Sequence, residues 1–278
     1  MKRNLIAAIA LISTICLFSQ MVQAQQIYVG LEGSYGLKIS PQDNTWFFTN
    51  VDQTGSVQTY KKVDFSLGQG FQTGITLGYM FSENIGADLG LAYFGGTACK
   101  AYYSNTDTLG VTETMDYSFK ATMFRINPSL LLSVTAGKIS PYMKFGVVLS
   151  TGSLEEVHEG VNNGDFIKTE YQYNKGMALG LSAAAGGSFK INDRFSVFGE
   201  FRMINMAYSP GKRVTTESSV NGVDLLPSLT TADKIVEYVD SYEYDYNNQP
   251  SQNEPSHWLK ENYSLNSIGL NIGVRFNL

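Results

Sequence analysis

The sequence predicts an all-β fold, a transmembrane up-and-down antiparallel β-barrel of eight strands with long external loops and short periplasmic turns. The first observation is the stretch 263–278. From Ile268 onward every second residue is large and apolar, and glycine, asparagine and arginine fall between these residues. Because side chains in a strand alternate between two faces, the stretch is a strand with one apolar and one polar face. Lipid outside and a polar lumen inside produce this pattern in a membrane barrel.

The second observation is the composition of the 278-residue chain. Apolar residues make up 43% and aromatic residues 13%, and there are 27 glycines. Beyond residue 24, however, no apolar run reaches the roughly 20 residues that a helical span requires. A membrane protein without such helices must be a closed barrel, since closure leaves no unpaired strand edge in lipid. The formal net charge of -5 and the lack of a basic cluster argue against nucleic acid as a partner.

The segment 1–24 has the order of a secretory signal peptide. Two basic residues precede an apolar run over 5–18, and the small residue Ala24 ends the segment. The apolar run is too short for a transmembrane helix. We therefore expect cleavage before Gln25, which leaves one outer membrane β-barrel domain over 25–278.

Eight segments follow the period-two rule. In each segment, large apolar residues alternate with small or polar residues, so that one face of the strand is apolar and the other is polar. In chain order the segments are 27–39, 71–81, 85–93, 124–132, 142–149, 177–189, 195–203 and 268–278. Pro128 lies inside the fourth segment, and because proline has no N–H to donate, we expect a β-bulge there.

The connections between these segments alternate strictly in length. Short turns at 82–84, 136–138 and 192–194 follow the second, fourth and sixth strands, and long segments follow the others. Bacterial barrels have short periplasmic turns and long external loops, so we expect an even strand count and a location in the cell outer membrane. The long segment 209–262 could add a hairpin around Asn221-Gly222, which makes ten strands the alternative.

Charged residues at inward positions form the candidate functional site, a lumen charge network. The lumen of an eight-stranded barrel is just wide enough for side chains to fill. The inward charges are Glu32, Lys38, Asp88, Arg125, Lys144, Glu200, Arg202 and Arg275. Two interpretations stay open: the charges pair and plug the lumen, or they line a narrow or gated pore.

The external loops are a second candidate surface. Trp46-Phe47-Phe48 suits anchoring at the membrane interface or binding a partner. In the last long segment, tyrosines alternate with acidic residues, as in an adhesive or cation-binding patch or in a strand with a solvated acidic face. These residues are Tyr238, Tyr242, Tyr244 and Tyr246, interleaved with Glu237, Asp240, Glu243 and Asp245. They lack the defined ligand spacing of an oxygen-rich metal site.

Enzymatic chemistry has few candidate residues. Beyond the leader there are only two histidines, His158 and His257, both in expected external loops, and one cysteine, Cys99. The sequence contains no phosphate-binding loop, zinc spacing or nucleophile elbow. We therefore expect no enzyme, no cofactor and no metal, and a loop-sited hydrolase or acyltransferase is the remaining enzymatic alternative.

Four stretches resemble the outer-membrane β-barrel proteins of the porin-like group common in Bacteroidetes, which are related in layout to the small OmpA-like, OmpW-like and opacity barrels. These stretches are 124–130, 140–146, 186–202 and 269–278. The resemblance covers essentially the whole chain after the leader and specifies architecture better than activity. It implies no catalytic residues, and without a following peptidoglycan-binding domain it does not imply wall tethering.

The same resemblance implies an assembly signal on the last strand. Its outward residues are Ile272, Val274, Phe276 and Leu278. Leu278 stands where such barrels usually end in an aromatic residue, so Phe276 is the residue expected to serve the barrel assembly machinery.

The leading functional expectation is a non-enzymatic surface protein of the porin family. The barrel anchors it in outer membrane lipid, and the loops contact an extracellular ligand or partner. A narrow channel for small or hydrophobic solutes is the alternative function.

Overall fold

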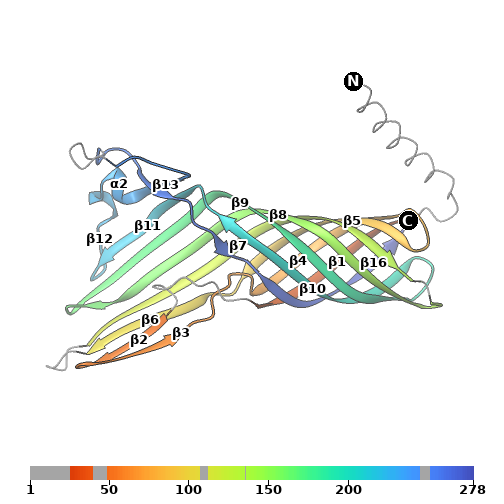
Figure 1. Cartoon of the computed structure of the whole chain (residues 1–278), viewed down its shortest axis with the longest axis horizontal. Coiled ribbons are helices and arrows are strands. Elements are labelled where there is room, and N and C mark those ends of the chain that lie inside the picture. The colour runs from red at the N-terminus through yellow and green to blue at the C-terminus, as the bar shows by residue number, and fades with distance from the viewer. Residues whose placement is uncertain (1–25, 40–48, 107–111, 135, 245–250) are drawn as a thin grey trace, which may run out of the picture.

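The computed structural model describes residues 26–39, 49–106, 112–134, 136–244 and 251–278. Eight strands close a ring in which every strand pairs antiparallel with both neighbours (Figure 1). In ring order they are β1 (Gln26–Lys38), β4 (Gly70–Met80), β5 (Ile85–Gly96), β7 (Thr112–Ser133), β8 (Ile139–Asn162), β9 (Asp165–Lys190), β10 (Phe195–Ser209) and β16 (Ser267–Asn277). The eight-stranded barrel is confirmed. The signal peptide 1–24, the aromatic cluster 46–48, Asp245 and Tyr246 lie outside the described residues.

The outer wall of the ring is an apolar belt. Large apolar side chains at outward positions are exposed on every ring strand, for example Leu31, Leu77, Leu130 and Phe201. The opposite parity of each strand is mostly buried in the lumen. This inside-out distribution is that of a barrel wall in lipid. No helix in the part of the chain that the structure describes is long and apolar enough to cross a membrane.

The short turns lie where the sequence predicted them, at the end of the barrel that we call the turn end. The bulge expected at Pro128 is absent, because the pairing register of β7 with β5 and with β8 is the same on both sides of it. The side-chain amide of Asn127 donates to the carbonyl of Val147, the residue opposite Pro128, over 2.9 Å. That bond supplies the donor that proline lacks. The β8–β9 ladder instead contains a bulge, where the register shifts between Gly152 and Leu154.

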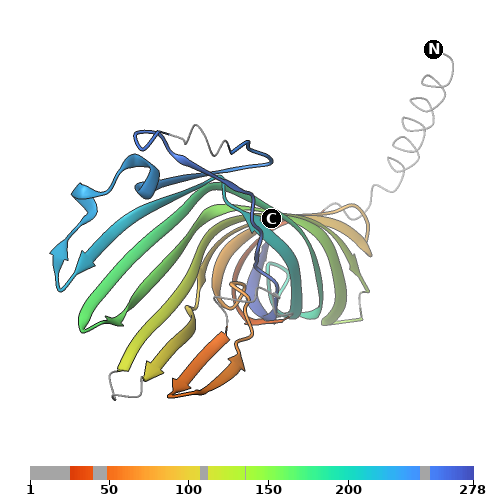
Figure 2. The ribbon, with the colours of Figure 1, turned by 60° about the vertical axis from the view of Figure 1, so that its left-hand side comes forward.

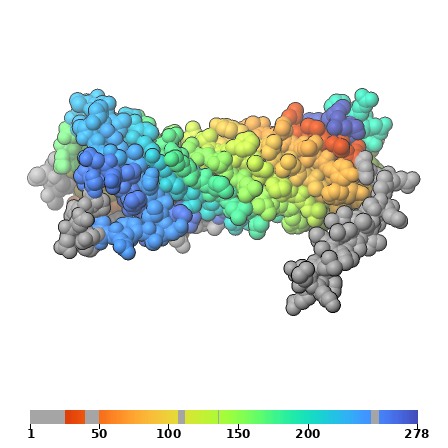
Figure 3. All heavy atoms as spheres, turned by 90° about the horizontal axis from the view of Figure 1, so that it is seen from above, coloured from red at the N-terminus to blue at the C-terminus, as the bar shows by residue number. Residues whose placement is uncertain are grey.

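The long connections contain an additional sheet, which we call the outer sheet. At the end of the barrel opposite the turn end, β7, β8 and β9 continue past the ring and carry further strands on both sides (Figures 1 and 2). These are β2 (Thr49–Thr54), β3 (Val57–Lys62), β6 (Cys99–Thr106), β11 (Lys212–Val220), β12 (Val223–Asp224), β13 (Ile235–Val239) and β14 (Ser256–Leu259). Figure 3 shows β11 to β14 gathered beyond the barrel. The chain also forms η1 (Leu226–Ser228), α2 (Thr231–Lys234) and β15 (Tyr263–Ser264).

The hairpin suggested at Asn221-Gly222 is present and joins β11 to β12, but it lies in the outer sheet. The ten-stranded alternative is therefore wrong. The acidic and tyrosine-rich stretch is a strand only over β13, where Tyr238 is buried, whereas Tyr242 and Tyr244 are exposed beyond its end.

The long β8–β9 hairpin depends on a two-residue turn at Asn163 and Gly164, whose φ angles are +52° and +84°. Such a turn matches the twist of the flanking strands and requires the left-handed region that glycine enters freely. We expect Gly164→Val to cost about 1–2 kcal/mol and to loosen the tip of the hairpin, measured as faster amide hydrogen exchange near the turn. Gly199→Val is the control, because an added Cβ there meets open space. Equal exchange in both variants would contradict the role of the turn.

Candidate functional site

The interior of the barrel is filled in layers, which follow the successive inward residues of β10 away from the turn end. The layer nearest the turn end is an aromatic box around Arg275. The guanidinium carbon lies 5.0 Å from the ring centre of Tyr28 and 4.7 Å from those of Tyr142 and Phe198. Aromatic faces attract a cation placed over them. Gly78 makes room for this box, because a Cβ there would overlap the Tyr28 ring.

In the next layer Lys144 joins two buried carboxylates. Its Nζ lies 3.0 Å from Oδ2 of Asp88 and 3.3 Å from Oε2 of Glu200. The hydroxyl of Tyr28 donates to Asp88, and that of Tyr142 donates to Glu200 over 2.8 Å. Each carboxylate is thus both paired and hydrogen-bonded, as a buried charge requires.

Arg202 links this layer to Glu32. Nη1 and Nη2 of Arg202 donate to the two oxygens of Glu32 over 2.9 and 3.0 Å, a bidentate pair. Nε and Nη2 also donate to Oε1 of Glu200 over 3.1 and 2.7 Å. The fully buried Asn271 donates to Glu32 over 3.1 Å and to Glu200 over 2.8 Å. A continuous ion-pair network therefore crosses the lumen, with members on β1, β5, β8, β10 and β16.

Five of the eight predicted charged residues form this ion-pair network, namely Glu32, Asp88, Lys144, Glu200 and Arg202. Arg275 lies in the adjacent box, and Arg125 lies on the other side of the network. The prediction for Lys38 is wrong. It lies at the far end of β1, where its ammonium is exposed and donates to the carbonyl of Asp64 over 2.9 Å.

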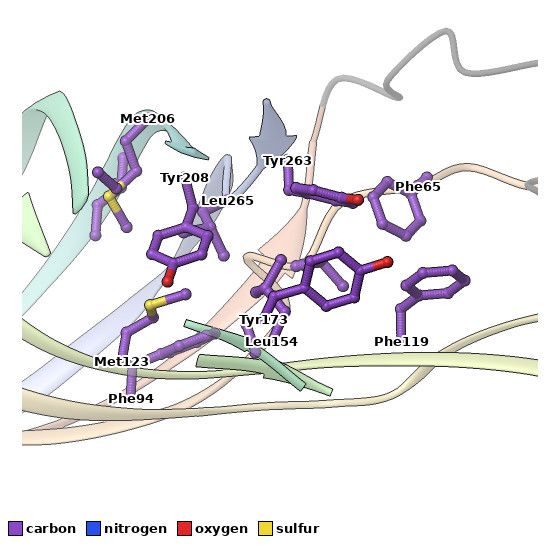
Figure 4. Close-up of a cluster of buried hydrophobic side chains, with 14 of the residues drawn as sticks. Phe65, Phe94, Phe119, Met123, Leu154, Tyr173, Met206, Tyr208, Tyr263 and Leu265 are labelled. Carbon is purple, nitrogen blue, oxygen red and sulfur yellow. The ribbon is translucent and has the colours of Figure 1, made fainter. Parts of the chain in front are cut away.

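Beyond the ion-pair network and Arg125, the interior is mostly apolar. A segment between β3 and β4, residues 63–69, folds into the mouth of the barrel, and we call it the mouth segment. Its Phe65 and Leu67 are fully buried. The N–H of Leu67 donates to the carbonyl of Ser264 over 2.8 Å, and Phe65 packs edge-on against Phe119. Figure 4 shows the cluster around them, which includes Phe94, Met123, Leu154, Tyr173, Met206, Tyr208, Tyr263 and Leu265.

Two small cavities remain inside the filled barrel. Their volumes are about 30 and 20 Å³. A cavity of roughly 10–15 Å³ holds one water molecule, so each of these holds one or two. The volume that these cavities offer to water is far smaller than that of an aqueous channel.

The concave face of the outer sheet carries a second group of polar and aromatic residues. Buried Glu156 accepts hydrogen bonds from the Tyr173 hydroxyl and shares one with Nε2 of His158. The guanidinium carbon of Arg213 lies 4.6 Å from the ring centre of Tyr171 and 4.3 Å from that of Trp258. These residues come from β8, β9, β11 and β14, and only the pairing of the outer sheet brings them together.

The tyrosines above the barrel give the outer sheet a dependence on pH. Burial raises the pKa of Tyr173 and Tyr263, and it raises the pKa of Tyr238 to about 12. A phenol whose pKa is raised on folding stabilises the folded form below the unfolded pKa of about 10 and loses that effect as the pH rises through the folded value. We expect the outer sheet to loosen between pH 10 and 12, measured as increasing cleavage by an alkaline-stable protease. Tyr238→Phe should shift this loosening to higher pH, and an unchanged profile would contradict the assignment.

The sequence did not single out the mouth segment, Asn271 or the aromatic box. Tyr28, Tyr142 and Asn271 lie at inward parity, so the period-two pattern could have identified them. The mouth segment offers only the short alternation of Val63, Phe65 and Leu67.

Other residues named from the sequence lie apart from the interior. His257 is exposed on β14 opposite Glu237, and the half-buried Cys99 places its Sγ 3.8 Å from the carbonyl of Asp64. The expected assembly residues Ile272, Val274 and Leu278 are exposed on the apolar wall. The ring of Phe276 packs against Phe195 at 5.1 Å between ring centres.

Several solved outer membrane proteins align with this chain at low identity. Curated proteins give no match to the chain. Among solved structures, neisserial surface protein A (NspA) aligns with 10% identity and a TM-score of 0.36, covering 92% of this chain and 100% of its own. OprG from Pseudomonas aeruginosa aligns with 13% identity and a TM-score of 0.41, covering 91% and 95%. Outer membrane protein W of E. coli aligns with 11% identity and a TM-score of 0.37, covering 93% and 100%.

The family comparison extends over most of the chain. The model of the outer membrane protein β-barrel domain matches residues 8–225. This range includes all ring strands except β16. The chain is therefore an outer membrane protein and belongs to the outer membrane protein β-barrel domain family.

Proposed function

We propose that this protein is a non-enzymatic surface protein in which the barrel is a sealed anchor and the outer sheet is the contact surface for an extracellular ligand or partner. The observation that carries the proposal is the filled lumen. Aromatic, ionic and apolar layers follow one another inside the ring, and the remaining cavities measure about 30 and 20 Å³. A solute path would have to pass all three layers.

The arrangement of the connections supports the assignment of sides. Barrels of the outer membrane have short turns on the periplasmic side and long connections outside. The outer sheet then faces the exterior, with the aromatic and charged groups around Arg213 and Trp258 on its concave face. Exposed aromatic residues and arginine are enriched at protein interfaces, which favours a binding role for this face.

Single-channel recording tests the sealed lumen. We expect purified, refolded protein to give no discrete conductance in a planar bilayer, and Lys144→Ala to be silent too, because the aromatic box and the apolar cluster remain. Folding of the inserted protein is checked by its mobility shift on heating before electrophoresis. Reproducible steps in the wild type would overturn the anchor and favour the narrow channel, with Lys144→Ala altering the step size.

The contact surface needs a test of its own. The double variant Arg213→Ala with Trp258→Ala removes the stacked pair of the outer sheet. It leaves the strand pairing of the eight-stranded ring unchanged. We expect this variant to remain silent in bilayers but to reduce the adhesion of cells that carry the protein on their surface, measured beside cells that carry the wild type. Adhesion equal to that of wild type would contradict this face as the contact surface.

The enzymatic alternative centres on His158. Its imidazole shares a hydrogen bond with Glu156 and packs edge-on against Tyr117 and Tyr171. We expect the protein to be inactive on lipid and peptide ester substrates. Hydrolysis that is lost in His158→Ala would overturn the non-enzymatic proposal.

Assembly in the membrane completes the proposed function. The outward residues of β16 present an exposed apolar face, with Phe276 packed on Phe195. We propose that this strand is the signal that the barrel assembly machinery reads. Phe276→Ser should reduce the amount of folded protein in the membrane, whereas Leu278→Ser should have the smaller effect.

A further inference from the structure

Arg125 is a buried cation without an anionic partner. It points inward from β7 with only 3% of its surface exposed. Its Nη1 donates to Oε1 of Gln72 over 2.8 Å, and its guanidinium carbon lies 3.9 Å from the ring centre of Phe94. Nε and Nη2 are buried with no hydrogen-bond acceptor among the described residues.

The other interior cations differ from Arg125. Lys144 and Arg202 each contact two carboxylates, and Arg275 lies in its aromatic box. No carboxylate in the described part of the chain forms an ion pair with Arg125. Below the outer sheet the interior holds four cationic side chains and three carboxylates, Glu32, Asp88 and Glu200, which leaves one positive charge in excess. The fourth buried carboxylate, Glu156, lies in the outer sheet against Tyr173 and His158. A charge in a low-dielectric interior is costly unless a counter-charge lies beside it.

The interior also offers space beside this guanidinium. Arg125, Gln72, Arg202 and Ile204 line both cavities, so the guanidinium lies in the wall between them. The smaller cavity has no carboxylate in its lining, and its volume of about 20 Å³ accepts an ion not much larger than water and excludes a solute of many atoms. Water could satisfy the two N–H groups, but water leaves the excess charge uncompensated.

We infer that the barrel binds one small monovalent anion of halide size against Nε and Nη2 of Arg125, within the smaller cavity, which Gln72 and Arg202 also line and which has no carboxylate in its lining. The anion completes the charge balance of the interior. Glu32 and Glu200 stay engaged with Arg202 and Asn271, so the anion has Arg125 as its own donor. The inference is independent of any partner of the outer sheet.

Thermal unfolding with chloride as the probe tests the site. Refolded full-length protein is heated in detergent while sodium chloride replaces sodium gluconate at constant ionic strength, because gluconate is too bulky for the cavity. An anion that binds only the folded state raises the unfolding temperature in a saturable way. We expect this upward shift in wild type and its loss in Arg125→Gln. The matched control Arg194→Gln removes an exposed arginine from the β9–β10 turn and should keep the shift.

A second measurement uses the wild type alone and decides the question even where Arg125→Gln does not refold. Crystals grown with sodium bromide should show an anomalous peak within hydrogen-bond distance of Nε or Nη2 of Arg125. Water without anomalous signal at that position would overturn the inference. Identical unfolding temperatures in chloride and gluconate for the wild type would overturn it as well.

Discussion

Replacing Glu200 with glutamine is expected to destabilise the folded barrel by about 3–5 kcal/mol, the cost of removing one partner from a buried charge pair. Glu200 accepts hydrogen bonds from Tyr142, Asn271 and Arg202 and pairs with Lys144. The neutral amide cannot balance the charge of Lys144 or Arg202. Its NH₂ group is a hydrogen-bond donor, and the groups that surround it are donors as well. The loss should be visible in urea unfolding from lipid vesicles followed by circular dichroism.

Glu83→Gln is the control for this substitution, because it makes the same chemical change at an exposed position in the β4–β5 turn. Exposed charges contribute about 0–1 kcal/mol, so the control should unfold close to the wild type. If both variants unfolded at the same urea concentration, the ion-pair network would contribute nothing to stability. A glutamine variant that gained conductance would show in addition that the network is the narrowest barrier.

Truncating the mouth segment is the second change with a large expected effect. Leu67→Ala should cost about 2–5 kcal/mol and Phe65→Ala about 3–5 kcal/mol, because both side chains are fully buried in the apolar cluster and leave cavities. Their costs should not add simply, since the two residues belong to one cluster. The mouth segment should also become accessible to protease, which provides a local measurement beside the global one.

Leu259→Ala is the matched control, since Leu259 on β14 is 57% exposed. We expect it to unfold within about 0.5 kcal/mol of the wild type. Conductance should stay absent in all three variants, because the ion-pair network and the aromatic box lie below the mouth segment. Discrete channels in Leu67→Ala would mean that the apolar layer alone closes the lumen.

The sequence was most informative where lipid and lumen lie on opposite faces of one strand. There the two environments impose apolar and polar side chains at alternate positions, so the eight ring strands and their short turns could be predicted. Above the membrane both faces meet water or other protein, and the alternation weakens. The upper part of β8, with Leu154, Glu156 and His158 inward, therefore did not stand out as a strand, although Asn163-Gly164 was a usable turn signal.

The interior was predictable as a set of charges but not as a set of contacts. Inward parity identified Glu32, Lys144 and Arg202, yet their partners lie on strands far apart in the sequence. Lys38 also occupies an inward-facing position in the alternation but lies at the mouth of the barrel. The alternation does not show how far along the barrel axis a residue lies. In the sequence Arg125 looked equivalent to the other inward cations. Only the structure shows that its neighbours are Gln72 and Phe94 rather than a carboxylate.

The continuity of β8 has a mechanical consequence. The strand has 24 residues, which corresponds to roughly 80 Å, well over twice the apolar height of such a barrel. The same backbone thus forms both the membrane wall and the outer sheet, with β9 beside it along almost its whole length. A pulling force on the outer sheet along this axis would load many ladder hydrogen bonds of β8 and β9 in shear at once, because no loop separates the outer sheet from the barrel wall in these two strands.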